Sequence, residues 1–587
     1  MKTGKMTLLI ILSAVLVLPA ILAYFMNSRA ESTGILHIEP EIGNYLYIER
    51  YDLEISGIDR DGVTWFFLPS YAELSSIDLV NSPEKLFLED GSLLSEPEFG
   101  KIQNITVGIH PDETLPWQIC FMKSSGLHTL FIDLEDTNLS DVEKGVFSRA
   151  SVRSYSESGT LDFLEKDCLI KGRGNATWDL GGYSPSKKPY EIRFSEAHGL
   201  GEFSPKKKWV LLANAYEGTG ILNKMVFDTA RNMDMNFVTE SDWADVYADG
   251  RYLGNYLICS EVQGSASSLL DTGGCIIEKN DVYFDEKPAG FKTSNDSFTI
   301  KAPKPIESEQ LHDVTALARA VDKDLEQPIP DLTHIDPASF VKWYLLEEVF
   351  YNEDALITSC FFYTDHKSET LFAGPPWDFD GTCGEAGWKY MDPTGSILKE
   401  EKDRQPLKWY ALLCNSSPEF NTETRKYFNM YMNIYKDLIL SGIDAYYDRI
   451  HASMAMDRAL YGRTGYGPEY TIPGYYDSVY NNIRFTKYFL YNRILYLAQL
   501  WDTDPGFTCE DLNDGTFHTL TLIYPDGSVS TQKAEDGMML QASSLPEFDP
   551  DEYDGWYYEA NDLPVSIFLP VFEDTTLYLH PLEASSS

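Results

Sequence analysis

GPPWDFDG, residues 374–381, is the stretch of sequence that says most about the fold. It places Asp378 and Asp380 on either side of one aromatic residue, directly after an apolar run. The preceding segments CFFYTD (360–365) and TLFAG (370–374) are short apolar runs separated by a polar HKSE. This pattern predicts a β-hairpin. The two aspartates therefore follow the second strand of a predicted hairpin.

A third aspartate precedes the hairpin. Asp354 ends the segment FVKWYLLEEVFYNED (340–354), which we expect to be helical. A protein-kinase active site has the same order of helix end, aspartate, hairpin and aspartate: one aspartate orients the substrate hydroxyl and the other holds Mg²⁺. Mg²⁺ prefers carboxylate oxygens and neutralises an anionic nucleotide. The alternative is structural, since aspartate is common in turns and at helix starts.

Basic residues concentrate in IKGRGNATWDLGGYSPSKKPYEIRF, residues 170–194. Arg173 and Asn175 lie in its glycine-bracketed part, and Lys187 and Lys188 lead into a predicted strand. A glycine loop followed by a strand lysine is by type a nucleotide-binding arrangement. Each element alone is a weak signal, and one of the two lysines is expected to be merely solvated.

Several stretches together resemble the spore coat protein H (CotH) kinase-like family, over about residues 126–505. The resemblance implies an atypical protein-kinase-like fold, binding of ATP with Mg²⁺ or Mn²⁺, and phosphorylation of Ser or Thr in a protein substrate. Spore-coat members phosphorylate coat proteins, other members are secreted, and fungal members are host-cell adhesins. The matching stretches recur in the family's order: IKGRGNATW (170–178), KKPYEIRF (187–194), KKWVLLANAYEGTGILNKM (207–225), DVYADGRYLGNYLICSEV (245–262), GGCIIEKND (273–281), and EVFYNEDAL, FFYTD and GPPWDFDGTCG between 348 and 384.

The resemblance assigns roles to single positions. Asp354 matches the catalytic aspartate, and Asp378 matches the metal-binding aspartate, with Asp380 as an accompanying acid. Glu261 matches an acidic position that could pair with the phosphate lysine, as a helix glutamate does in ordinary kinases. The positions implied at the nucleotide are Arg173, Asn175, Lys187 or Lys188, Asn223 and Glu261.

The chain also departs from the family pattern. Ser359 stands five residues after Asp354, where the family usually has a metal-binding Asn. In EGTGILN (217–223), Glu217 replaces an Asp and Leu222 replaces an Arg. Serine is a poorer Mg²⁺ ligand than an amide carbonyl, and loss of the arginine removes a positive charge near the expected polyphosphate. These departures put catalysis in doubt more than they put the fold in doubt.

Composition limits the other functions. The 587 residues include 91 acidic and 47 basic ones, a net charge of −44 that disfavours nucleic acid as a partner. The ten histidines show no HExxH spacing, and no Walker motif or GxSxG elbow is present. The eight cysteines form no CxxC pairs, so a structural zinc site is not expected, and disulfides are permitted without an assigned pairing.

The first 30 residues predict export. Lys2 and Lys5 precede an uncharged apolar run from Met6 to Phe25, followed by small residues before Glu31. If it is not cleaved, this run is long enough to span a bilayer. We therefore expect an extracellular or cell-surface protein, with membrane contact only through this N-terminal segment.

The remaining chain reads as an α+β protein with a two-lobed kinase-like core, strand-rich in front and helix-rich behind. We expect a β-rich domain over residues 31–125, the kinase-like domain over 126–505, and a linker at 502–512. Residues 512–583, with YDGWYY and EDTTLY, resemble the Listeria–Bacteroides repeat, a small β-grasp module of surface proteins. Its presence implies extracellular residence and no chemistry of its own.

Two functions from different classes remain open. The first is an exported protein Ser/Thr kinase, favoured by the Asp354 and Asp378 pair. The second is a surface binding or adhesion protein on a kinase-like scaffold, favoured by Ser359 and Leu222. The segment SPKKKWVLL (204–212) is expected to place three lysines on a solvated turn, apart from either function.

Overall fold

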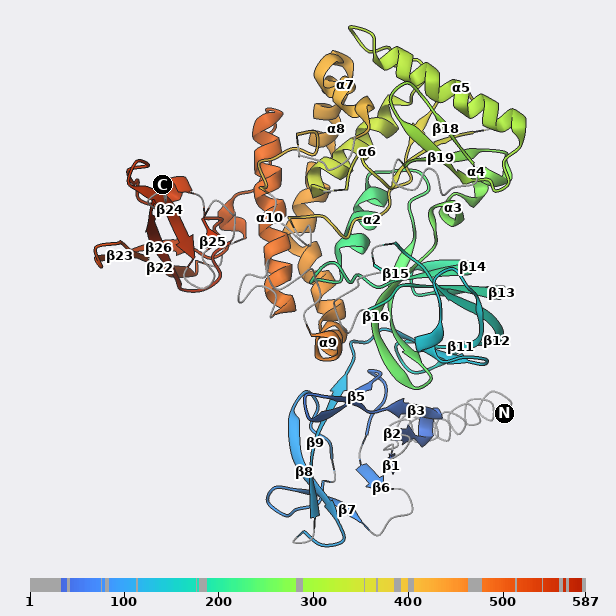
Figure 1. Cartoon of the computed structure of the whole chain (residues 1–587), viewed down its shortest axis with the longest axis vertical. Coiled ribbons are helices and arrows are strands. Elements are labelled where there is room, and N and C mark those ends of the chain that lie inside the picture. The colour runs from blue at the N-terminus through green and yellow to red at the C-terminus, as the bar shows by residue number, and fades with distance from the viewer. Residues whose placement is uncertain are drawn as a thin grey trace, which may run out of the picture.

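The computed structural model is a mixed α+β protein with several sheets, drawn in Figure 1. The residues that it describes are 33–39, 43–74, 76–79, 84–94, 96–111, 114–175, 177–178, 187–280, 289–352, 354–365, 368–384, 392–399, 406–462, 478–512, 515–540, 542–558, 563–565 and 570–582. The predicted export segment lies outside these residues. Within them, no helix combines the length and the apolar character needed to cross a membrane.

Two sheets lie at the N-terminal end of the described chain (Figure 1). One has the strand order β3-β2-β1-β6 and the other β4-β5-β9-β8-β7. Their buried residues form one core that also includes Tyr247 and Tyr252 of the next sheet and Met456 of a distant helix. The strands are β1 (Thr33–Glu39), β2 (Gly43–Ile48), β3 (Leu53–Ser56), β4 (Ile58–Arg60), β5 (Val63–Leu68), β6 (Ser76–Leu79), β7 (Lys85–Leu88), β8 (Ile102–Gly108) and β9 (Thr114–Lys123).

A closed barrel follows, in the order β10-β11-β12-β13-β14-β16-β15. Antiparallel neighbours build most of it, and β10 closes it by pairing in parallel with β15. Every residue of β15 is buried, because its outer face is covered by the rest of the protein. The strands are β10 (His128–Leu134), β11 (Ser148–Tyr155), β12 (Leu161–Gly172), β13 (Tyr190–Leu200), β14 (Phe203–Leu212), β15 (Ser241–Ala248) and β16 (Arg251–Cys259).

The SPKKKWVLL prediction was wrong. These residues belong to β14 rather than to a solvated turn: exposed and half-buried positions alternate through the lysines, and three consecutive buried residues follow. Pairing of Lys208 with Arg193 on β13 extends the sheet through the lysine run. The three lysines masked a strand signal that Trp209, Val210 and the two leucines after them carry.

A smaller sheet and a set of helices complete the central part (Figure 1). Its strand order is β18-β19-β17-β20-β21. Helix α6 begins at Asp336, whose side chain accepts a hydrogen bond from the Ser339 N–H at 2.7 Å, with Pro337 in the first turn. The elements are α2 (Leu222–Asn232), α3 (Val262–Ser265), α4 (Ser267–Asp271), β17 (Cys275–Lys279), β18 (Gly290–Lys292), β19 (Ser297–Ala302), α5 (Ser308–Leu325), α6 (Pro337–Phe350), β20 (Cys360–Thr364) and β21 (Phe372–Ala373).

The later helices pack around α6 and share one large core with α2 and the small sheet. Helix α8 continues through a π-helical turn, Leu438–Gly442, into α9. Phe420, Phe428, Tyr431 and Tyr435 of α8 are buried in this core, and Tyr427 packs against it partly buried. The helices are α7 (Lys408–Ser416), α8 (Pro418–Asp437), α9 (Ile443–Tyr461) and α10 (Val479–Leu500).

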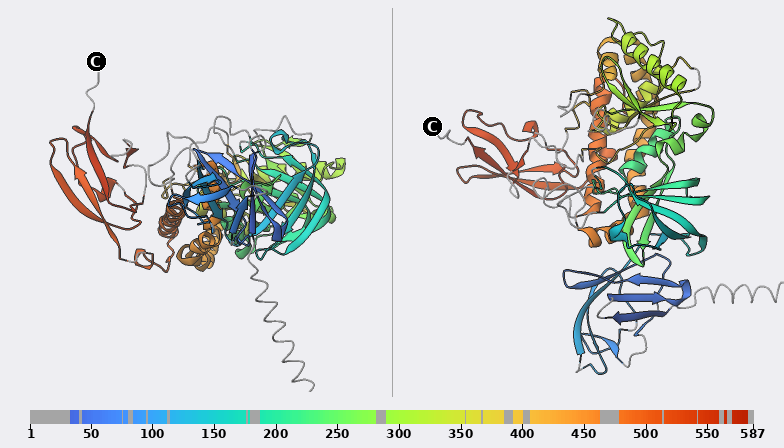
Figure 2. Two further views of the ribbon diagram at one scale, coloured as in Figure 1. Left: turned by 90° about the horizontal axis from the view of Figure 1, so that it is seen from below. Right: turned by 45° about the vertical axis from the view of Figure 1, so that its right-hand side comes forward.

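The C-terminal sheet lies beside α10, clear of the barrel (Figures 1 and 2). Its order is β23-β22-β26-β24-β25, and its first and last strands, β22 and β26, are parallel neighbours. Arg484 of α10 holds it: the guanidinium pairs with Asp536 and lies 3.9 Å from the ring centroid of Phe572. The strands are β22 (Phe517–Ile523), β23 (Val529–Glu535), β24 (Tyr553–Tyr558), β25 (Leu563–Pro564) and β26 (Thr575–Pro581).

Candidate active site

The predicted hairpin is confirmed, because β20 and β21 pair in an antiparallel register. The chain leaves β21 through Gly374 and reaches Asp378, whose φ of 74° lies in the left-handed region. A non-glycine residue with such a φ is strained and persists only where its surroundings hold it. Asp378 therefore owes its position to specific contacts.

Asn352, which sequence reasoning missed, ties Asp354 to Asp378. Its Oδ1 accepts a hydrogen bond from the Asp354 N–H at 3.1 Å, and its Nδ2 donates to the Asp378 carbonyl oxygen at 3.3 Å. Asn352 is buried and lies just beyond the end of α6. One side chain thus fixes the backbones of both predicted aspartates. The signal was present in the sequence as the asparagine two residues before Asp354.

Two further side chains hold the loop that carries Asp378. The Ser359 hydroxyl donates to Oδ2 of Asp378 at 2.8 Å. Asn223, in the first turn of α2, accepts the Phe379 N–H on its Oδ1 at 2.9 Å. Both residues were predicted site residues, and the structure brings both to Asp378 or to its neighbour. The Asn223 side chain thus contacts the backbone of the loop.

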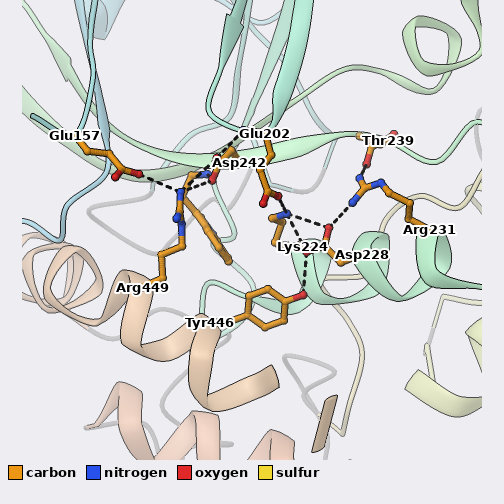
Figure 3. A network of polar contacts seen from close by, with 10 residues as sticks. Glu157, Glu202, Lys224, Asp228, Arg231, Thr239, Asp242, Tyr446 and Arg449 are labelled. Carbon is orange, nitrogen blue, oxygen red and sulfur yellow. Dashed lines mark hydrogen bonds and ion pairs between the residues drawn. The ribbon is translucent and has the colours of Figure 1, made fainter. Parts of the chain in front are cut away.

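Helix α2 is itself anchored by a polar network, shown in Figure 3. The buried Lys224 ammonium lies 3.0 Å from the Glu202 carboxylate and 2.8 Å from that of Asp228. The Tyr446 hydroxyl of α9 donates to Asp228 at 2.9 Å. Because these contacts join α2 to the barrel and to α9, they fix the direction from which Asn223 reaches the Asp378 loop.

A fourth carboxylate, that of Glu217, lies in the segment before α2. Oε2 of Glu217 accepts the N–H groups of Thr219 and Gly220 at 2.7 and 2.8 Å. Its Oε1 is buried without a hydrogen-bond partner. Leu222 is fully buried in the large core, so the position where the family has an arginine is occupied here by packing.

The carboxylates interact with one another. Burial raises the pKa of Asp378, although the Ser359 hydrogen bond and the positive charge of Arg173 oppose the rise. Burial raises the pKa of Asp380 well above its usual range, and the charges of Asp378, Asp354 and Glu217 raise it further. Four acidic side chains therefore share one region, and a cation or a proton would relieve their repulsion.

The residues predicted to bind the nucleotide do not all lie near these carboxylates. Arg173 does, since its guanidinium lies 5.8 Å from the ring centroid of Trp377 and its charge acts on Asp378. Asn175 is exposed. The ammonium of Lys188 lies 4.4 Å from the ring centroid of Trp178. Lys187 is buried and pairs with Asp457 of α9 at 2.6 Å.

The partner suggested for Glu261 was wrong. Its carboxylate pairs at 2.8 Å with Lys208, from the strand mistaken for a turn, and not with Lys187 or Lys188. Burial would raise the pKa of Glu261, but Lys208 and then Arg173 lower it overall. The lysine–glutamate pair at this site is therefore built from β14 and the residue that precedes α3.

The chemistry of the donors fits a hard divalent cation. Carboxylate oxygens are the ligands that Mg²⁺ and Mn²⁺ prefer, and Oε1 of Glu217 is buried and unpaired. In the described part of the chain, however, no group of three or more His, Cys, Asp or Glu side chains is arranged so as to hold a metal ion. The oxygen donors fit by type, while their present positions do not form a closed ligand set.

A comparison with models of known protein families agrees with the resemblance predicted from the sequence. The model of the CotH kinase protein family matches residues 170–497, more than half of the chain, and the chain therefore belongs to that family. The predicted resemblance to CotH is thereby confirmed. The protein is kinase-like, and the site residues described above fall within the matched range. A search of curated proteins gives no match.

Proposed function

We propose that the protein is an exported atypical protein kinase that transfers the γ-phosphoryl group of ATP to Ser or Thr of a protein substrate. The observation that carries the proposal is the side chain of Asn352, which joins the backbones of Asp354 and Asp378 through hydrogen bonds of 3.1 and 3.3 Å. A site for phosphoryl transfer needs one carboxylate at the acceptor hydroxyl and another at the phosphates, in fixed relative positions.

The roles follow from the surroundings of each side chain. Asp354 orients the acceptor hydroxyl and accepts its proton. Asp378 and Asp380, with Ser359 beside them, hold Mg²⁺ or Mn²⁺. When bound, the cation neutralises charge on the phosphates. Arg173 adds a fixed positive charge on the side of Trp377.

The overall architecture supports the same proposal. The closed barrel and the helix-rich part around α6 would form the two lobes, with α2 between them. The C-terminal sheet has parallel first and last strands at its centre, an order that fits a β-grasp module of surface proteins. With the predicted export segment, this order favours residence outside the cell or at its surface, and an uncleaved segment would anchor the protein by its N-terminus. The N-terminal sheets, predicted as a β-rich domain over residues 31–125, share a core with the barrel and α9.

A second function is favoured by specific observations. Ser359 donates its only proton to Asp378, and Leu222 fills the core where the family has an arginine. Both changes weaken metal and phosphate binding. A non-catalytic surface protein that binds or adheres to a protein partner on this scaffold would need neither group.

The test uses Asp378→Asn, which removes the charge while asparagine tolerates the left-handed backbone. We expect wild-type protein to be thermally stabilised by ATP with Mg²⁺ or Mn²⁺ and to incorporate labelled phosphate. The variant should lose the divalent-dependent part of the stabilisation. Asp234→Asn is the matched control, because Asp234 has a φ of 53° and is exposed. Equal shifts in Asp378→Asn and wild type would refute a metal site at PWDFD, and divalent-dependent binding without incorporation would favour the second function.

A further inference from the structure

Lys301 of β19 occupies a β-bulge next to the candidate site. Strand β17 pairs with β19 so that Ile276 faces Ala302 and Ile277 faces Ile300, which leaves Lys301 as the extra residue. A bulge re-aims the side chain at the extra position, and bulges are frequent beside active sites. The direction of Lys301 is therefore set by the backbone.

The bulge directs Lys301 to the face of the small sheet that carries Phe361. Its ammonium lies 5.0 Å from the ring centroid of Phe361. Phe361 and Thr299 both pair with Glu278, so the three side chains share that face. Trp377 packs against the same apolar cluster as Phe361.

Arg173 reaches this surface from the barrel side. Its guanidinium lies 5.8 Å from the ring centroid of Trp377. Two half-buried cations are thus each held over an aromatic ring of one surface. Trp377 directly precedes Asp378 in the sequence, so this apolar cluster borders the loop that carries the candidate metal-binding aspartate.

We propose that Lys301 and Arg173 together bind the polyphosphate of the nucleotide, with Lys301 supplying the positive charge that Leu222 does not. The assignment rests on the proposed function and names the side chain that contacts the phosphates in it. Of the two lysines that the family resemblance offers, Lys187 is buried against Asp457 and its ammonium also donates to the Asn255 carbonyl, while the ammonium of Lys188 lies over the Trp178 ring.

The ligand chemistry follows from the geometry. A chain of phosphates bridged by a divalent ion fits this geometry. Two cations lie over rings of one apolar cluster, and the neighbouring acids favour the divalent ion. A nucleoside without phosphates would not use them. Inorganic tripolyphosphate should therefore bind by itself when Mg²⁺ is present.

The first experiment measures by calorimetry how tightly the protein binds three ligands: ATP with Mg²⁺, tripolyphosphate with Mg²⁺, and adenosine alone. We expect Lys301→Gln to weaken binding of both polyphosphates by about tenfold or more, the loss of one charge-assisted contact, and to leave adenosine unchanged. Lys301→Arg should retain most of the affinity. Lys323→Gln, an exposed lysine of α5, is the control and should match wild type.

The second experiment needs no variant and so does not depend on how a variant folds. Wild-type protein is treated with a lysine-acylating reagent, and the modification of Lys301 is followed by mass spectrometry. Mg²⁺ with tripolyphosphate should protect Lys301 and leave Lys323 reactive. Unchanged acylation of Lys301, or wild-type affinity in Lys301→Gln, would refute the assignment while the proposed function stands. A wild type that binds neither polyphosphate would refute both.

Discussion

The buried pair of Lys187 and Asp457 decides whether Lys187 is a structural or a phosphate-binding residue. The side chains are 3% and 2% exposed, and the ammonium lies 2.6 Å from Oδ2 of Asp457. Oδ1 of Asp457 also accepts the Asn255 N–H at 2.8 Å. The pair therefore joins the segment before β13, strand β16 and helix α9 in one contact.

Removing one partner of such a pair leaves an uncompensated buried charge. We expect Lys187→Met to lower the free energy of unfolding by about 3–5 kcal/mol. Its sequence neighbour gives a matched control: Lys188 lies over the Trp178 ring, so Lys188→Met should cost only about 0.5–1 kcal/mol. The double variant Lys187→Met/Asp457→Asn should regain most of the loss, because asparagine is neutral and keeps an acceptor for the Asn255 N–H.

The deficit should also depend on pH. Burial raises the pKa of Asp457, and Lys187 opposes that rise. Without Lys187 the folded-state pKa lies still higher, so the native variant binds a proton that the unfolded chain releases. Its stability is then retained at acidic pH and lost as pH rises through the raised pKa. Lys187→Met should be closer to wild type at pH 5 than at pH 8.

The assay is urea unfolding at both pH values, followed by tryptophan fluorescence, with ATP-induced thermal shifts measured in parallel. The structural reasoning is refuted if Lys187→Met costs no more than Lys188→Met and yet abolishes the ATP shift. That result would instead assign Lys187 to phosphate binding.

Three other predictions concern the acidic cluster, its support and the C-terminal sheet. Asp380→Asn should stabilise metal-free protein at pH 8, because burial and neighbouring carboxylates raise the pKa of Asp380 and so cost stability as pH rises; melts in EDTA should show the gain vanish below about pH 4. Asn352→Ala should lower the free energy of unfolding by about 1–3 kcal/mol and weaken divalent-dependent ATP binding, and a fall in stability alone would limit Asn352 to a structural role. Arg484→Ala should accelerate proteolysis within residues 502–512, because the ion pair with Asp536 is lost, and an unchanged rate would mean that the sheet docks without it.

Local pattern was sufficient for much of the fold. The helix α2, the hairpin of β20 and β21 and the helices after residue 308 follow from periodicity and turn residues. The prediction was wrong at the three lysines before Trp209, which were assigned to a turn although their pairing with β13, a tertiary feature, makes them part of β14. The two-lobed arrangement and the domain boundaries stay predictions.

The site was predictable where a residue acts through its own chemistry, and not where a distant partner defines it. Asp354, Asp378 and Asp380 were predicted as carboxylates after regular elements, and their roles stay predictions. The partner of Lys187 lies 270 residues further along the chain, so no local pattern indicates it. Lys301 is placed by a bulge, which depends on the register of β19 against β17. A single sequence does not specify that register.

The departures at Ser359 and Leu222 change the charge and ligands of the site more than its shape. Tyr351, Leu356, Ser359 and Asp378 all have left-handed backbones, and each such residue costs about 1–2 kcal/mol. Contacts from elsewhere hold this strained geometry. Asn352 and Asn223 bind the carbonyl and the N–H of one peptide bond, the one that joins Asp378 to Phe379, and neither hydrogen bond involves the altered side chains.

The backbone that follows Asp378 is therefore held by contacts other than that of the residue at 359. What Ser359 adds is one hydrogen bond of 2.8 Å, which favours the charged form of Asp378 and so favours a cation beside it. Relative to the family pattern Leu222 removes one positive charge, while Arg173 and Lys301, each over an aromatic ring, both act on Asp378. In the proposed kinase, such changes would lower the affinity for metal and phosphate before they disturbed the geometry for transfer.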